Sequence, residues 1–501
     1  MKDADQIRES SLDISDEALA ELSAGAAALV TDYFSRVSTL PVFPNTSAGE
    51  TTRRLGSELP IEGEPVAMLL NDCRAIVDRS RHNGHPRFLA YVASPSTAPG
   101  AFADLIASAL NPSVTSWRSS PAATEVEHLV VRWLGALVAY AEDPRGLLIS
   151  GGSLANLTAL LIAQRAKAAG DIARKGLWNS TTPMTIYASD QIHMSIPKAA
   201  DILGIGRDQV RIVASDDRFR LDVAALRNSI ESDLKAGLKP FCIAASAGTV
   251  NTGAVDPLAE IANVAAEYGL WFHVDGAYGA LGALDERKRP LFAGIERADS
   301  LSLDPHKWLF TPVDCGCLLF RDAAAARAAF AANEADYIKV HGLADDQAFA
   351  FWDYGIELSR RFRALKIWMT LRYYGTRRIA AVISENNSLA AYMAVRITAA
   401  EDFELLAPVE LSICCFRYVP ESIRAKLQNA SETELMQLNS ELDELNATIM
   451  HTVQHGGRAY LSNATVNGKF ALRACITNFR TTRADIDETI EVVRAAGRIG
   501  S

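Results

Sequence analysis

Short apolar segments alternate with longer amphipathic segments through the middle of the chain, from about residue 96 to residue 385. The short segments have the length and residue types of buried strands, and the longer ones have the apolar spacing of helices. Such alternation predicts an α/β fold, in which a mostly parallel sheet carries helices on both faces. The expected strands are Gly146–Ser150, Met184–Ser189, Phe241–Ser246, Leu270–Asp275, Ser300–Leu303 and Cys315–Phe320, and the expected helices are Ala122–Ala139, Leu154–Ala169, Pro257–Tyr268 and Arg360–Tyr373.

The segments on either side of this region have different patterns. Ser15–Val37 has the spacing of a helix with Ser15 as its cap, and a second helix is expected near residues 65–80. After residue 395, strand and helix patterns typical of a small α+β domain follow one another: Leu411–Tyr418, Thr433–His455, Ala471–Phe479 and a final helix. We therefore expect three parts: an N-terminal helical segment (1–95), a large α/β domain (96–390) and a small C-terminal α+β domain (391–501).

Composition excludes several classes of protein. The chain has 501 residues, a net charge of −10 and no cluster of Lys or Arg, so no nucleic-acid partner is expected. It has no apolar run of about eighteen residues and no signal-peptide core at its N-terminus, so we expect no membrane span and a cytoplasmic location. The seven cysteines include no Cys-x-x-Cys pair, and they fit small core residues better than metal ligands.

Two charged residues follow predicted strands in unusual surroundings. Lys307 lies in a Pro-His turn directly after the strand Ser300–Leu303, and Asp275 ends the apolar strand Leu270–Asp275. In a parallel sheet, ligands gather at the carboxyl ends of the strands. One pocket at this edge could therefore collect both residues, together with Ser153, His193 and Thr249, which lie at or soon after strand ends.

A lysine and a carboxylate in one pocket are what a pyridoxal 5'-phosphate site needs. The lysine amine can form a Schiff base with the cofactor aldehyde. The carboxylate can keep the pyridinium nitrogen protonated, so that the ring accepts electrons. The turn Ser150–Ser153 follows a strand and opens a helix, where free backbone amides and the positive helix end suit a phosphate group.

The motifs around Lys307 and Asp275 closely resemble those of the pyridoxal-phosphate-dependent amino-acid decarboxylases. This family contains the aromatic-L-amino-acid, histidine, glutamate and diaminobutyrate decarboxylases (group II). The family motifs are Asn/Asp-Pro-His-Lys-Trp and His-Val-Asp-Ala-Ala-Tyr, and this chain has Asp304 in the first and Gly276 in the second. The resemblance implies a fold-type I enzyme, similar to aspartate aminotransferase, that acts as a homodimer and converts an L-amino acid to its amine and carbon dioxide.

The resemblance also implies roles for individual residues. His193 is placed against the cofactor ring and near the leaving carboxylate, while Ala277 packs on the opposite ring face. Asp304 falls on the phosphate side, where an anion needs a hydrogen-bond donor between itself and the phosphate, so its role stays open. The implied cofactor contacts are Gly152, Ser153, His193, Thr249, Asp275, Ala277, His306 and Lys307.

Two further residues are implied in catalysis or substrate binding. Tyr337 lies thirty residues after the lysine, near the position of a mobile-loop tyrosine thought to protonate the carbon left by loss of carbon dioxide. Relatives with phenylalanine there can form aldehydes instead. Arg360 lies in a run that matches the family, and it is a candidate contact for the substrate carboxylate, with a structural ion pair as the equal alternative.

The substrate itself is less well specified. The segment His85–Ser94 resembles the family's substrate-lining segment, so Tyr91, Ser94 and Thr115 are expected at the substrate. Val92 and Ala93 make this wall smaller than in aromatic members, whereas Ser359 accompanies phenolic substrates in plant relatives. We expect an aromatic, tyrosine-like L-amino acid. The alternatives are a 2,4-diaminobutyrate- or glutamate-type decarboxylase, an aromatic aldehyde synthase, an aminotransferase of the same fold, and a cofactor-binding protein without catalysis.

Overall fold

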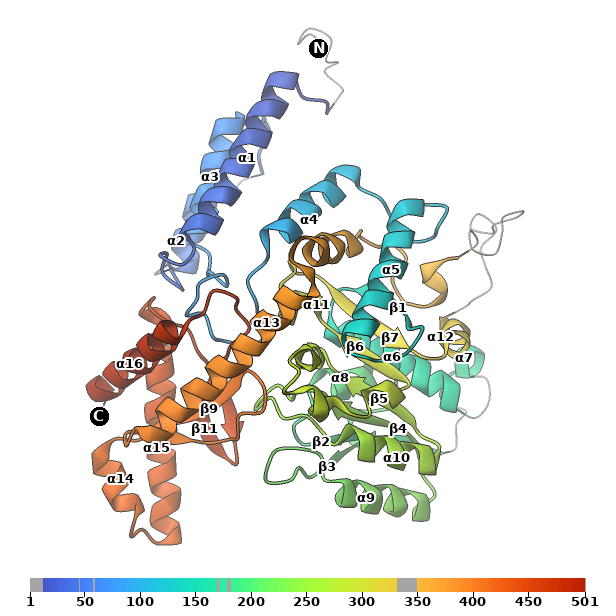
Figure 1. The fold of residues 1–501 in the computed structure, drawn as a ribbon, viewed down its shortest axis with the longest axis vertical. Coiled ribbons are helices and arrows are strands. Elements are labelled where there is room, and N and C mark those ends of the chain that lie inside the picture. The colour runs from blue at the N-terminus through green and yellow to red at the C-terminus, as the bar shows by residue number, and fades with distance from the viewer. Residues whose placement is uncertain are drawn as a thin grey trace.

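The computed structural model describes residues 12–500, apart from positions 45, 57–58, 169–171, 178–181 and 331–348. A helical segment at the N-terminus, a large sheet covered by helices, and a smaller C-terminal sheet follow one another along the chain (Figure 1). The N-terminal helices are α1 (Asp16–Arg36), α2 (Ala48–Leu55) and α3 (Val66–Asp78). As predicted, Ser15 caps α1, because its hydroxyl accepts a hydrogen bond from the Ala18 N–H at 3.2 Å.

The large sheet has seven strands in the order β1-β7-β6-β5-β4-β2-β3. Strand β7 runs antiparallel to both of its neighbours, and the other pairs are parallel. The predicted α/β fold with a mainly parallel sheet is therefore confirmed. The strands are β1 (Arg145–Ile149), β2 (Met184–Ser189), β3 (Val210–Val213), β4 (Lys239–Ser246), β5 (Trp271–Asp275), β6 (Ser300–Leu303) and β7 (Gly316–Phe320).

Helices surround the large sheet (Figure 1). Every residue of β2, β5, β6 and β7 is buried, as expected for strands covered on both faces. Each apolar side chain buried there contributes roughly 1.5–3 kcal/mol. The helices are α4 (Ala98–Leu110), α5 (Pro121–Leu137), α6 (Gly152–Lys167), α7 (Ile172–Lys175), α8 (Ser195–Ile202), α9 (Val223–Lys235), α10 (Leu258–Tyr268), α11 (Pro305–Trp308), α12 (Ala323–Phe330) and α13 (Ala364–Ala399).

A second core lies between the C-terminal sheet and its helices. The four strands have the order β10-β11-β9-β8 and are antiparallel throughout. The end of α13, which includes Leu389 and Met393, packs into this core, so one helix joins the two sheets. The elements are β8 (Phe403–Leu405), β9 (Ile413–Tyr418), α14 (Glu421–Leu427), α15 (Glu432–His455), β10 (Ser462–Val466), β11 (Lys469–Cys475) and α16 (Arg483–Gly500).

Two details differ from the sequence-based expectation. The helix predicted from Arg360 begins at Ala364, and it continues to Ala399 through a non-helical residue, Gly375 (φ 71°). Strand β3 was not predicted, because it has only four residues, two of them not buried, at the sheet edge. Among the described residues, no helix is both long and apolar enough to span a membrane, and no group of three or more acidic, His or Cys side chains is placed to bind a metal ion.

Candidate active site

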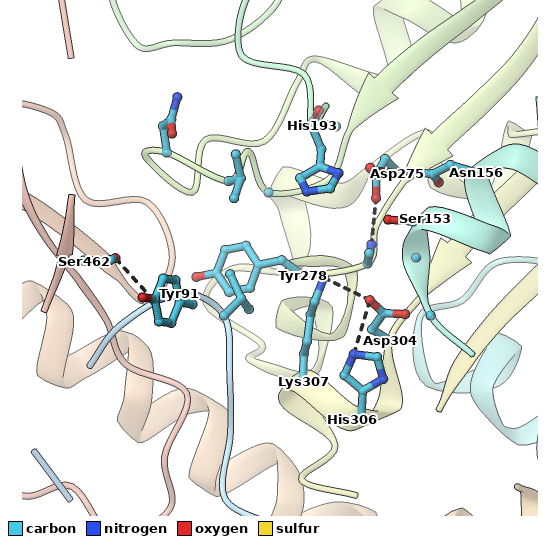
Figure 2. A pocket seen from close by; sticks show the side chains of 18 of the residues that line it. Tyr91, Ser153, Asn156, His193, Asp275, Tyr278, Asp304, His306, Lys307 and Ser462 are labelled. Atoms are coloured by element: carbon cyan, nitrogen blue, oxygen red, sulfur yellow. Dashed lines mark hydrogen bonds and ion pairs between the residues drawn. The ribbon is translucent and has the colours of Figure 1, made fainter. Parts of the chain in front are cut away.

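A cavity of about 540 Å³ lies at the carboxyl ends of β4, β5 and β6 and reaches the C-terminal sheet. Lys307, Asp275 and His193 point into this space from three separate segments (Figure 2). Tyr91 and Ser462 bring in the N-terminal part and the small sheet on the other side. As expected from the sequence, one edge of the sheet brings together Lys307, Asp275, His193 and Ser153.

Asp275, the last residue of β5, is held as a carboxylate. Its Oδ1 accepts hydrogen bonds from the Ser302 hydroxyl at 3.0 Å and the Ala277 N–H at 3.1 Å. Its Oδ2 accepts one from Asn156 Nδ2 at 2.8 Å. Burial alone would raise the pKa of this carboxyl, but the charge of Lys307 and the neighbouring imidazoles and N–H group hold it below its usual range.

Lys307 lies on the short helix α11 and faces a second acid, Asp304. Lys307 Nζ is 2.9 Å from Asp304 Oδ2, and the Asp304 side chain is only 3% exposed. Burial lowers the pKa of Lys307, but the charges of Asp304 and Asp275 outweigh it and raise the pKa above its ordinary value. Asp304 Oδ1 has no hydrogen-bond partner in the described part of the chain.

The start of helix α6 lies directly beside Asp304. A Cβ added to Gly152 would be 2.8 Å from Ala277 Cβ and 3.0 Å from Asp304 Oδ2. Only glycine therefore leaves space between the backbone amides of this turn and the cavity. His306 closes the same corner: its Nδ1 accepts the Cys315 N–H at 3.1 Å, and burial lowers its pKa. Its other nitrogen, Nε2, is 3.7 Å from Asp304 Oδ2.

These features fit pyridoxal 5'-phosphate. A buried amine for the aldehyde, an ionised carboxylate at a strand end and a side-chain-free helix N-terminus for a phosphate share one cavity. His193 and Ala277 are available for the ring faces. The cavity is also large enough for a cofactor and a small substrate.

Four predicted site residues do not line this cavity in the single chain. The Thr249 hydroxyl is buried in its own turn, where it accepts the Ala254 N–H at 3.1 Å, so the neighbouring residues of that turn line the cavity instead. Thr115 contacts Ser119 outside the cavity. Ser94 lies behind the lysine turn and donates to the His306 carbonyl at 3.0 Å.

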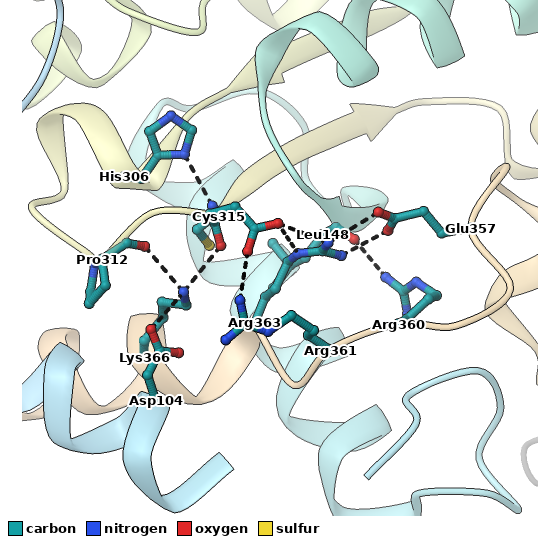
Figure 3. Close-up of polar contacts among 11 residues, drawn as sticks. Asp104, Leu148, His306, Pro312, Cys315, Glu357, Arg360, Arg361, Arg363 and Lys366 are labelled. Atoms are coloured by element: carbon teal, nitrogen blue, oxygen red, sulfur yellow. Dashed lines mark hydrogen bonds and ion pairs between the residues drawn. The ribbon is translucent and has the colours of Figure 1, made fainter. Parts of the chain in front are cut away.

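Arg360 is the fourth, and it is a structural residue. Its side chain is 1% exposed and pairs with the buried Glu127. It also donates to the carbonyl of Val114 at 2.7 Å and to that of Leu148 at 2.7 Å, and Figure 3 shows Arg360 beside Leu148. Of the two roles expected for Arg360, the structure therefore supports the structural ion pair. The guanidinium does not line the cavity. Tyr337 lies outside the described residues.

Sequence reasoning missed Arg473, which lines the cavity from β11. It donates to the Tyr91 carbonyl at 2.8 Å and to the Asn251 carbonyl at 3.2 Å. Its Nη2 is buried and has no hydrogen-bond partner among the described residues. The sequence feature that could have revealed Arg473 is a charged residue inside the otherwise apolar run Phe470–Cys475.

Comparison with known proteins identifies the family of this chain. The pyridoxal-dependent decarboxylase conserved domain matches residues 49–419. The chain belongs to this family. The aromatic-L-amino-acid decarboxylase of Bacillus atrophaeus is 34% identical over 485 residues, which cover 97% of this chain and 96% of that protein. A phenylacetaldehyde synthase of Petunia hybrida is 32% identical over 476 residues, 93% of this chain and 91% of that protein.

Solved structures agree with the family. The crystal structure of Oryza sativa TDC with PLP and tryptamine superposes with a TM-score of 0.88 at 28% identity, covering 98% of this chain and 99% of that one. The predicted fold-type I architecture is confirmed by this match. The chain is therefore a pyridoxal-phosphate-dependent decarboxylase by family, fold and cofactor.

Proposed function

We propose that this decarboxylase converts an aromatic, tyrosine-like L-amino acid to its amine. The observation that carries the proposal is the buried Lys307 amine, which shares a cavity with the ionised Asp275. The relatives named above act, by name, on aromatic amino acids or form an aromatic aldehyde, and this supports the substrate class. When bound, the cofactor supplies an electron-accepting ring for the electrons of the broken Cα–carboxylate bond.

Each residue of the site then has a defined task. Lys307 would hold the cofactor through its side-chain amine. Asp275 keeps a positive charge on the ring nitrogen, because its carboxylate stays ionised in a buried place. The amides of Gly152 and Ser153 take the phosphate, with His306 beside them. His193 and Ala277 confine the ring between them.

Arg473 is our candidate for the substrate carboxylate. A buried guanidinium with a free Nη2 at the cavity wall is a site for an anion. Its backbone contacts fix its position before substrate arrives, so little ordering is required on binding. We assign this role to Arg473 and not to Arg360, because the Arg360 guanidinium is already paired with the Glu127 carboxylate.

A screen of the purified protein with added pyridoxal phosphate tests the proposal. Tyrosine, dihydroxyphenylalanine, phenylalanine, tryptophan, histidine, glutamate and 2,4-diaminobutyrate are incubated separately, and both amine and carbon dioxide are measured. We expect equal amounts of the two products and the highest kcat/KM with a phenolic substrate. Preference for glutamate or 2,4-diaminobutyrate would overturn the substrate class while leaving the reaction intact.

One relative supports a second candidate function. The Petunia hybrida phenylacetaldehyde synthase matches 93% of this chain, so oxygen-dependent aldehyde formation deserves the same assay. We propose that Tyr337 protonates the substrate carbon and thereby favours the amine. Aldehyde, ammonia and hydrogen peroxide measured under air would show whether the second activity is present.

We also propose that the enzyme is a homodimer. Large apolar side chains are exposed on the N-terminal helices and on α4, including Met68 (54%), Leu105 (60%) and Leu110 (66%). In Figure 1, α1 and α3 extend away from the body of the molecule, where a second copy could cover them. Light scattering of the purified enzyme should give twice the chain mass, and a monomer with full activity would contradict this.

A cytoplasmic location is our proposal for the compartment. All seven cysteines are free, and all but Cys73 are buried in the core. A reducing compartment suits such thiols. Fractionation of the native host, with the enzyme followed by activity, would test this.

A further inference from the structure

Behind the cavity, buried polar side chains form a connected series of hydrogen bonds. The indole Nε1 of Trp271 donates to Ser300 Oγ at 2.9 Å. An indole nitrogen can only donate, so the Ser300 hydroxyl keeps its own proton for His273 Nδ1, also 2.9 Å away. Burial lowers the pKa of His273 to about 4, so its ring is neutral with a single proton, which lies on Nε2. That proton is donated to Asn156 Oδ1 at 3.0 Å.

Asn156 continues this series of directed hydrogen bonds toward the cavity. Its Nδ2 is 2.8 Å from Asp275 Oδ2 and 2.8 Å from Ser195 Oγ. The opposite amide orientation would set Oδ1 against an ionised carboxylate, so Asp275 determines which atom is nitrogen. The amide group then donates to Ser195 Oγ, and the Ser195 hydroxyl proton is left for its remaining neighbour.

That neighbour is Nδ1 of His193. The Ser195 hydroxyl is 2.8 Å from this nitrogen, and the Ser195 backbone N–H donates to it at 3.2 Å. A backbone N–H cannot accept, so Nδ1 must be the unprotonated nitrogen of the ring. The ring proton is then on Nε2, which has no hydrogen-bond partner among the described residues (Figure 2).

The charges around His193 agree with a neutral ring. Burial lowers the pKa of His193 most strongly, and the Lys307 ammonium lowers it as well. Asp275 and Asp304 act in the opposite direction and do not overcome these two effects. The ring is thus neutral near neutral pH, in agreement with the hydrogen-bond directions.

We propose that Asn156 and Ser195 are positioning residues that fix His193 as the neutral tautomer with its proton on Nε2, so that His193 donates a hydrogen bond into the cavity and does not act as a base there. This inference rests on the proposed place of His193 at the cofactor and substrate. It adds a task for Asn156 and Ser195, which act on the reaction through His193. Their effect reaches the reaction only through the protonation state of one imidazole.

Nitrogen NMR of the cofactor-loaded enzyme, labelled with ¹⁵N-histidine, tests the tautomer directly. His193→Gln identifies the signals of this ring among the nine histidines. In the wild type we expect one unprotonated nitrogen, Nδ1, and one protonated nitrogen, Nε2, in a sample above neutral pH. Ser195→Ala and Asn156→Ala keep the Ser195 backbone N–H at Nδ1 but remove or release the hydroxyl, so a measurable fraction of the Nδ1-protonated tautomer should appear, and Ser195→Ala should lose on the order of tenfold in kcat.

Two matched variants separate positioning from general damage. Ser302→Ala also removes one hydrogen bond to Asp275, but it leaves the series from Asn156 to His193 intact, so it should keep the single tautomer. Ser195→Thr keeps the hydroxyl and should restore the wild-type signals. A wild-type ring protonated on Nδ1 or on both nitrogens, or unchanged signals in both alanine variants, would overturn the proposal. Because the signals need no substrate, this result does not depend on the substrate class.

Discussion

Lys307 Nζ and Asp304 Oδ2 are 2.9 Å apart, so the amine assigned to the cofactor is paired with a carboxylate one helical turn before it. The short helix α11 produces this pair, because residues three apart lie on one face of a helix. The pair stabilises the ammonium form of Lys307 in the enzyme without cofactor. Only the neutral amine can attack an aldehyde, so Asp304 should slow the first step of cofactor loading.

Asp304→Asn should therefore speed the reaction of Lys307 with an aldehyde. Removing the carboxylate that raises the pKa of Lys307 lets burial lower it, so more amine is neutral at a given pH. Free pyridoxal, which carries no phosphate, isolates this effect from phosphate binding. Borohydride trapping on Lys307, measured against pH, should show its midpoint at lower pH in the variant.

A matched control for this prediction exists in the same molecule. Lys366 is another buried lysine, and its Nζ is 3.0 Å from Asp104 Oδ2 (Figure 3). Asp104→Asn removes a carboxylate from a lysine outside the cavity, so it should leave the trapping midpoint of Lys307 unchanged. An unchanged or higher midpoint in Asp304→Asn would show that the pair does not govern the amine.

Asp275→Asn should keep the cofactor and lose most of its turnover. A neutral amide cannot stabilise the positive ring nitrogen on which electron withdrawal depends. We expect kcat to fall on the order of a thousandfold, about 4 kcal/mol of barrier. Cofactor content, measured after release in alkali, should stay near one per chain. Ser302→Ala keeps the charge and removes one hydrogen bond, so near-equal losses in both variants would refute the role of the charge.

Much of the fold followed from local pattern. Strand β2 is mostly apolar and strand β6 alternates Ser with Leu; both are bounded by turn residues, and their positions were predicted to the residue. Strand β3 is short and only half of its residues are buried, so its place depends on pairing with β2, which no local pattern reveals. The start of α13 was misplaced because Arg360 is held by Glu127 and two distant carbonyls, not by a helix.

The site was predictable where it lies at strand ends of one sheet. Asp275 and Lys307 follow neighbouring parallel strands, so their meeting follows from topology alone. Arg473 comes from the other sheet, and its approach to the cavity depends on how the two sheets pack. Asn156 and Ser195 lie next to predicted residues, yet their directed hydrogen bonds require the orientation of side chains from two helices and a strand.

Arg473→Gln should weaken binding of the amino acid and spare binding of the product amine. A hydrogen-bonded charge pair contributes roughly 1.5–3 kcal/mol, so KM should rise on the order of tenfold to a hundredfold. The amine lacks the carboxylate, and its competitive inhibition constant should not change. Arg360→Gln is the matched control: it removes a buried ion pair and should lower Tm instead. Equal weakening of substrate and amine would mean that Arg473 only shapes the cavity.

Tyr337→Phe should form less amine and more aldehyde under air. A phenol can deliver a proton to the substrate carbon before oxygen reacts there, and a phenyl ring cannot. Amine, aldehyde and ammonia are quantified for the same substrate consumption, with and without oxygen. If the variant gives amine at the wild-type rate and ratio, another group donates the proton.

His85→Asn should make the enzyme less sensitive to mild acid. His85 is 1% exposed, and its Nδ1 accepts the Arg87 N–H at 3.0 Å. Burial lowers its pKa from 6.5 to about 4, so its contribution to stability is complete above pH 6.5 and is lost as pH falls towards 4. Over that range the unfolded chain binds a proton that the folded chain excludes, and stability should fall by about 3 kcal/mol. Asparagine can accept a hydrogen bond from the same N–H without titrating. As pH falls, Tm should therefore decrease less steeply in the variant than in the wild type. Parallel curves of Tm against pH would assign the acid sensitivity to other groups.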